Sequence, residues 1–171
     1  MSNILRIPIL SGALALSVLA SAQFGTPPVI SVKVESVTVP MGKNVNAVVT
    51  IKFSEGLHAY ANPSSDPSLI PVKITAGDKS VTLIKVNYPK GTPTKVEGEP
   101  KPVYVYAGTI QIPVTVQVPA KPGKATIKLK VGYQQCNTQS CFPPSTFVAE
   151  AVVNVLKQKI SVKPMAAPKG K

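Results

Sequence analysis

The stretch Ile110-Gln111-Ile112-Pro113-Val114-Thr115-Val116-Gln117-Val118 places an apolar residue at every second position. Successive side chains of a β-strand point to opposite faces of its sheet, so this alternation predicts a strand with one face on a core. The same period of two recurs at 45–53, 127–133 and 147–156. The sequence is therefore expected to fold as a sheet protein.

Turn-forming residues separate these segments. The 18 prolines and 11 glycines are spread along the 171 residues, and long helices would not survive that spacing. Shorter extended segments are expected at 29–39, 57–60, 71–75, 81–86 and 103–106, whereas the polar stretch 88–102 is long for a connection. We predict an all-β protein: an antiparallel, immunoglobulin-like β-sandwich of about eight or nine strands, broadly defined.

The N-terminal residues predict a secretory signal peptide. Arg6 precedes an apolar run at 7–20, and Ala20-Ser21-Ala22 has the small residues of a cleavage site. The alternative is a membrane anchor, but the run is shorter than the roughly 20 apolar residues of a spanning helix and contains Pro8 and Gly12. We favour the signal peptide.

Removal of this segment leaves one expected domain. The predicted parts are a signal peptide at 1–22, a flexible leader at 23–28, a β-sandwich at 29–156 and a basic disordered tail at 157–171. No later segment is apolar enough to span a membrane, so the mature protein is expected to be soluble, monomeric and located in the periplasm or another extracytoplasmic compartment.

The net charge of +12 comes mainly from scattered lysines, five of them in the tail from residue 157 onward. Such charge could bind nucleic acid or an anionic surface. With few aromatic residues and no recognisable nucleic-acid module, a solvated strand face and a basic tail explain it better. No nucleic-acid partner is expected.

The two cysteines stand close together, in Cys136-Asn137-Thr138-Gln139-Ser140-Cys141, between two predicted strands. An exported protein meets an oxidising compartment, so one disulfide is expected. A bridge that closes a ring of about six residues contributes only about 2 kcal/mol by the chain-entropy estimate. A weak staple makes redox chemistry plausible, but a structural disulfide that shapes the loop remains equally open.

The residues around this pair resemble a known family. Gly132-Tyr133-Gln134-Gln135-Cys136, followed by Cys141-Phe142-Pro143-Pro144, is similar to the Tyr-Gln-x-Cys…Cys-x-Pro-Pro signature of the N-terminal domain of the thiol:disulfide interchange protein DsbD. Upstream, Glu55-Gly56-Leu57-His58-Ala59-Tyr60, Tyr88-Pro89-Lys90-Gly91 and Ile110-Gln111-Ile112-Pro113-Val114 resemble further family segments in the same order. The likeness runs from about residue 45 to 156.

The resemblance implies an immunoglobulin-like periplasmic domain whose cysteines cycle between dithiol and disulfide. Such a domain accepts electrons from a membrane-embedded thiol-transport partner and passes them to thioredoxin-like periplasmic proteins. Carried over, Cys141 would be attacked in the mixed disulfide and Cys136 would be its resolving thiol, an order that could be reversed. The family's cap loop over the cysteines would correspond to about 95–101.

The sequence also departs from the family pattern. Well-known members have one more residue between the cysteines, and the cap stretch here has Glu97 and Glu99 but no aromatic residue. His58 stands where a tyrosine would be expected. The sequence contains neither an eight-helix membrane region nor a thioredoxin domain with Cys-x-x-Cys. Either both are expected to come from other proteins, or the protein does something else.

Exchange chemistry requires a thiolate, because the thiol itself is a poor nucleophile. His58, the only histidine, could accept the thiol proton if the fold brings it to Cys136; otherwise it is a strand residue with no role. Glu97 and Glu99 are further candidate proton acceptors, although negative charge would raise a cysteine pKa, and a solvated loop is their simpler interpretation.

Three aromatic residues could line the site. Tyr60 and Tyr133 are expected as walls of the site or as plain core, and Phe142 could shield the disulfide in place of the missing cap aromatic. No cofactor and no metal is expected, because one histidine and two cysteines fall short of the four ligands of a structural zinc site.

Two functions of different classes follow. The first is electron relay through Cys136 and Cys141 by thiol–disulfide exchange, an oxidoreductase-type activity if the pair is redox-active. The alternative is a non-catalytic sandwich for binding or assembly, with a structural disulfide. The sequence names neither the electron donor nor the acceptor.

Overall fold

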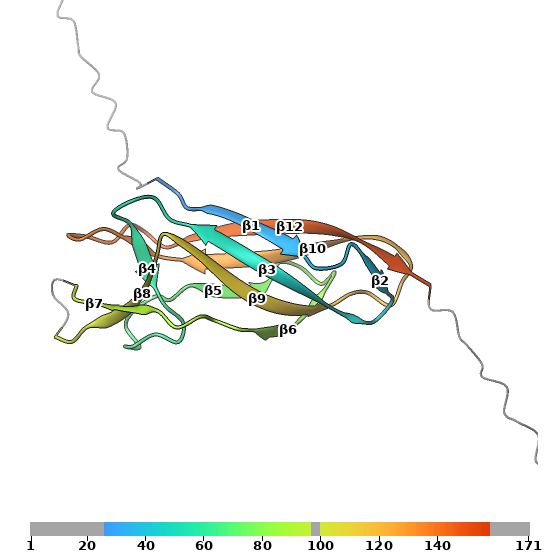
Figure 1. Ribbon diagram of the computed structural model, residues 1–171, viewed down its shortest axis with the longest axis horizontal. Coiled ribbons are helices and arrows are strands. Elements are labelled where there is room, and N and C mark those ends of the chain that lie inside the picture. Colours follow the sequence, from blue (N-terminus) through green and yellow to red (C-terminus); the bar gives the residue numbers. More distant parts are fainter. Residues whose placement is uncertain (1–25, 97–99, 158–171) are drawn as a thin grey trace, which may run out of the picture.

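The computed structural model describes residues 26–96 and 100–157. The predicted signal peptide, Glu97, Glu99 and residues 158–171 of the predicted tail lie outside them, as do residues 23–25 of the predicted leader. All regular structure in the described parts is β (Figure 1). Within those parts there is no helix that could cross a membrane.

Twelve strands are formed by residues 26–96 and 100–157. They are β1 (Val29–Val34), β2 (Thr38–Pro40), β3 (Asn44–Lys52), β4 (His58–Tyr60), β5 (Lys73–Ala76), β6 (Thr82–Val86), β7 (Thr92–Thr94), β8 (Val103–Ala107), β9 (Thr109–Gln117), β10 (Gly123–Tyr133), β11 (Gln135–Cys136) and β12 (Ser145–Leu156). Three four-stranded sheets result, in the orders β1-β3-β9-β6, β2-β12-β10-β5 and β11-β4-β8-β7. The only parallel pairing between these strands is that of β2 with β12.

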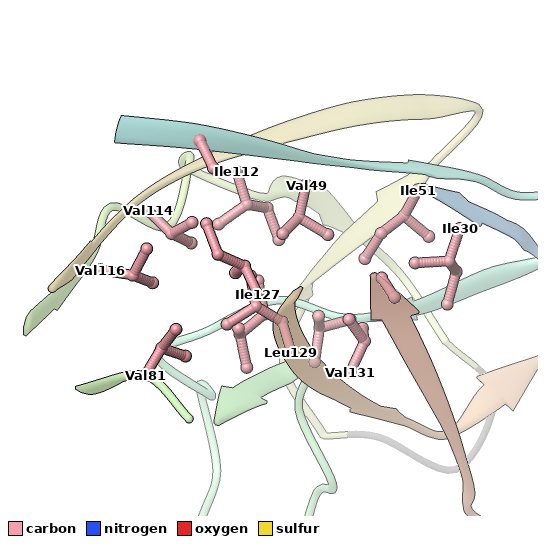
Figure 2. Packing of buried hydrophobic residues seen from close by; sticks show 14 of the residues in the cluster. Ile30, Val49, Ile51, Val81, Ile112, Val114, Val116, Ile127, Leu129 and Val131 are labelled. Carbon is pink, nitrogen blue, oxygen red and sulfur yellow. The ribbon is translucent and has the colours of Figure 1, made fainter. Parts of the chain in front are cut away.

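The first two sheets enclose the main core. The alternation in 110–118 is confirmed, since Ile112, Val114 and Val116 are at most 1% exposed while Gln111 and Gln117 face solvent. From the other sheet, Ile127 and Leu129 of β10 pack against them, and both are fully buried (Figure 2). Burial of one face of each sheet against the other is what makes the predicted sandwich.

The third sheet lies at one end of the sandwich and carries the cysteines (Figure 1). Ala59 and Tyr106 on one of its faces belong to the main core. The residues of the opposite face, which include Tyr60, Val105 and Cys136, form a separate small cluster. The third sheet, called the small sheet below because its strands are short, therefore packs on the sandwich through one face. The cysteine pair lies on its other face.

The structure contains more strands than the eight or nine predicted, because the additional ones are very short. β11 has two residues and β7 has three, too few for an alternating pattern to be recognised. β4 also has three residues, but it lies in the stretch 57–60 that was expected to be extended. β7 lies inside the stretch 88–102, which was expected to be a connection, and includes Pro93. It is an edge strand, where proline is tolerated.

Hydrogen bonds of Tyr106 and close packing at Gly91 fix the positions of the loops around the small sheet. The Tyr106 hydroxyl donates to the carbonyl oxygen of Pro89 at 2.7 Å and accepts from the backbone N–H of Asn62 at 3.4 Å. The backbone of Gly91 lies so close to Ala61 that a Cβ at position 91 would be 2.5 Å from the Cβ of Ala61. Only glycine fits this position without displacing its neighbours.

Candidate functional site

Cys136 and Cys141 form a disulfide at the end of β11, as the sequence predicted. Their Cα atoms lie 3.9 Å apart, and the two residues pair as an isolated antiparallel bridge. The N–H of Phe142 donates to the carbonyl oxygen of Gln135 at 2.8 Å, which extends this pairing. The disulfide thus closes a tight hairpin.

Asn137 organises the turn of this hairpin. Its N–H donates to the Ser140 carbonyl oxygen at 2.9 Å, and its side-chain Oδ1 accepts from the N–H groups of Gln139 and Ser140, each at 2.8 Å. An asparagine that satisfies its own turn in this way is a common device of tight loops. The turn holds the second cysteine opposite the first.

The two sulfurs lie in different environments. Cys136 is completely buried, whereas Cys141 is exposed. The hydroxyl of Tyr60, a residue only 5% exposed, donates to Sγ of Cys141 at 3.8 Å. Of the two cysteines, Cys141 is therefore the one on the surface that a partner can approach, while Cys136 is shielded from solvent.

A small apolar cluster surrounds the buried sulfur. Cys136 packs with Tyr60, Val103 and Val105, and this cluster is covered in part by Leu69 and Val96. Leu69 comes from the loop that follows β4, and Val96 lies within the stretch 95–101 that was expected to correspond to the family's cap loop. Apolar surroundings disfavour a thiolate, so any charge that develops on Cys136 needs a nearby partner.

His58 lies next to Cys136 across the β4–β11 ladder, where the two residues are direct partners. Its ring meets that of Tyr60 edge-on, with 6.5 Å between the centroids. Its Nε2 atom is buried and has no hydrogen-bond partner among the described residues. Burial lowers the pKa of His58 below its ordinary value of 6.5, because desolvation disfavours the imidazolium.

A hollow of about 550 Å³ opens beside His58. Its lining comes from residues 53–58 and from β7, β8 and the glycine that follows β8. Its walls are Phe53, Ser54, Glu55, Gly56, Leu57, His58, Thr94, Val105, Ala107 and Gly108. His58 and Val105 therefore belong both to this hollow and to the sheet face that carries the disulfide.

The structure does not place the other residues predicted for the site in the cluster around Cys136. Tyr133 belongs to the main core at 8% exposure, and burial raises its pKa. Phe142 is half-buried and lies outside the cluster around Cys136. Glu97 and Glu99 fall in the part of the stretch that the structure does not describe. The structure thus brings together Cys136, Cys141, His58 and Tyr60.

Sequence reasoning missed several residues of the site. Val103 and Val105 line it because alternate residues of β8 share the face of Cys136. Leu69 had a usable signal, since it is a large apolar residue in a loop of turn formers. Gln135, only 5% exposed, donates from Nε2 to the Thr26 carbonyl oxygen at 2.9 Å, and nothing in the sequence indicated this contact.

No group of three histidine, cysteine or acidic residues within 26–96 and 100–157 is arranged to hold a metal ion. The reactive groups of the site are the cysteine sulfurs, the His58 imidazole and the Tyr60 hydroxyl.

Residues 27–152 match the family described as thiol:disulfide interchange protein DsbD, N-terminal. The chain belongs to this family. Its cysteine pair, placed as described above, is accordingly that of a thiol:disulfide interchange domain. No curated protein matches the sequence.

The chain is also similar to solved structures. The N-terminal periplasmic domain of ScsB from Proteus mirabilis aligns with a TM-score of 0.52 and 10% identity, over 70% of this chain and 43% of that one. This chain therefore spans less than half the length of that domain. The reduced DsbD N-terminal domain of Neisseria meningitidis aligns with a TM-score of 0.43 and 18% identity, over 73% of this chain and 85% of that one.

Proposed function

We propose that this protein relays electrons by thiol–disulfide exchange through Cys136 and Cys141, between a membrane thiol donor and thioredoxin-like partners. It would act in the periplasm or another extracytoplasmic compartment, after removal of residues 1–22. The observation that carries the proposal is the asymmetry of the disulfide, in which Cys141 is an exposed residue and Cys136 is fully buried. A pair built for exchange needs one sulfur that a partner can attack and one that leaves.

The exchange follows from this asymmetry. A donor thiolate attacks Sγ of Cys141, the Cys136–Cys141 bond breaks, and Cys136 leaves as a thiolate. The donor's second thiolate then attacks the donor sulfur that is joined to Cys141, which releases Cys141 as a thiolate. Two electrons enter the protein, the donor becomes a disulfide, and both cysteines take up protons. The reverse sequence passes the electrons to an acceptor disulfide.

The location of the bridge also supports exchange over a structural role. It joins residues five apart in sequence, at the end of the two-residue strand β11. The main core is built from both large sheets and includes neither cysteine. A non-catalytic binding sandwich with a structural disulfide would gain little from a bridge placed there.

Trapping experiments test the proposal. A Cys136→Ser variant should form a stable mixed disulfide through Cys141 with a thioredoxin-like partner, because the resolving thiol is gone. The matched Cys141→Ser variant should form little or none, because Cys136 is buried. The products are separated on a non-reducing gel and mapped by mass spectrometry. Equal trapping by both variants would refute the assigned order of attack, and no trapping by either would refute exchange.

A further inference from the structure

We propose that His58 is the proton acceptor for Cys136 when the disulfide forms. This inference deepens the proposed function and rests on it, since it assigns the residue that makes the resolving thiol reactive. The sequence alone left His58 between this role and none.

The ladder puts His58 in the right place. It is the direct partner of Cys136 in the antiparallel pair of β4 with β11, so both side chains are on the same face. Directly opposite residues have Cβ atoms about 4.5–5.5 Å apart. On its other side His58 pairs with Ala107 of β8, whose small side chain leaves room for the imidazole.

The buried Nε2 atom of His58 also supports the assignment of this residue as the proton acceptor. Buried polar atoms are nearly always hydrogen-bonded, yet Nε2 of His58 is buried without a partner among the described residues. In the disulfide state, Cys136 has no proton to offer. In the dithiol state its S–H becomes a donor directly across the ladder, and Nε2 can accept it in the tautomer protonated at Nδ1.

The electrostatics around His58 favour a neutral base. Tyr60 of β4 and Cys136 of β11 share its face, and Glu55 lines the adjoining hollow. β8 contributes Ala107 and Val105 and β7 contributes Thr94, none of which titrates. Burial lowers the pKa of His58, so the imidazole is neutral at pH 7 and free to take a proton.

Formation of the Cys136–Cys141 disulfide, called ring closure below, moves one proton and exchanges one sulfur–sulfur bond. With Cys141 in a mixed disulfide with a partner thiol, the Cys136 S–H bond gives its proton to Nε2 of His58. The Cys136 sulfur attacks Sγ of Cys141, the bond to the partner sulfur breaks, and the partner leaves as a thiolate. That thiolate takes up a proton, directly or through water, as the imidazolium returns to neutral. The protein loses two electrons and the partner disulfide is reduced.

Ring closure with glutathione tests this role. Reduced protein is mixed with glutathione disulfide, and quenched samples are analysed by mass spectrometry for the mixed disulfide and the closed ring between pH 5.5 and 9. His58→Gln keeps a polar side chain but cannot accept the proton. We expect it to slow ring closure at pH 7 by about tenfold or more, within the range of general-base effects. Formation of the mixed disulfide at the exposed Cys141 is the internal control and should change by less than about twofold.

The pH profile separates a proton acceptor from a structural residue. In the unsubstituted protein the closure rate should level off once His58 is neutral. In His58→Gln it should keep rising by about tenfold per pH unit toward the thiol pKa. Parallel profiles, or closure unchanged by the substitution, would overturn the proposal.

A second measurement requires no variant. His58 is the only histidine, so its NMR signal titrates without ambiguity, and its midpoint should coincide with the break in the closure profile of the unsubstituted protein. A mismatch would also overturn the proposal. Glutathione replaces the partner here, so relay can fail while this role stands, and the role can fail while relay stands.

Discussion

Alkylation of the reduced protein should fall almost entirely on Cys141. Iodoacetamide needs both a thiolate and access, and Cys136 is completely buried while Cys141 is exposed. Modification of Cys136 requires local opening of the small sheet, so we expect the two rates to differ on the order of 100-fold. Peptide mass spectrometry of samples quenched at short times gives both rates from one experiment.

The denatured protein supplies the control for this prediction. In concentrated guanidinium chloride the two cysteines lose their environments, and their rates should converge to within a few fold. A Cys136→Ser chain should keep the fast reaction and a Cys141→Ser chain should lose it. Comparable rates for the two thiols in the native protein would contradict the assignment of Cys141 as the attacked residue.

Replacing Leu129 by alanine should cost about 2–5 kcal/mol of unfolding free energy, the usual range for a large-to-small change in a well-packed core. Leu129 is fully buried in β10 and packs between the two large sheets (Figure 2). Urea denaturation followed by circular dichroism measures the change.

Val152→Ala is the matched control for Leu129→Ala. Val152 lies on β12, the strand next to β10, but its side chain is 56% exposed. Its truncation should change stability by no more than about 0.5 kcal/mol. Similar losses for the two variants would contradict the sandwich core described above.

The strands that bury one face could be predicted from sequence, and so could β4, but the two-residue strand β11 that places Cys136 could not. The stretches 45–53 and 110–118 contain enough alternations to define a period, and β3 and β9 occupy them. The pairing of β4 with β8 and with β11 joins segments far apart in the sequence, so its register has no local pattern. The strand pairing that places the site therefore has to come from the structure.

The site itself divides in the same way. The cysteine pair was visible because its residue types and spacing are unusual, and the disulfide forms as expected. The neighbour relation of His58 and Cys136 depends on the register of a two-residue strand, so the sequence left the role of His58 open. Tyr133 could have been wall or core, and the packing of β10 against the other sheet puts it in the core.

The equilibrium reduction potential of the Cys136–Cys141 pair tests the central claim most directly. The protein without residues 1–22 is equilibrated in defined thiol–disulfide buffers, and its free thiols are trapped and counted. Electron relay predicts a value within the range of thioredoxin-like partners, roughly −270 to −120 mV. A value well below about −300 mV would mark a structural disulfide and contradict the relay, leaving a binding sandwich.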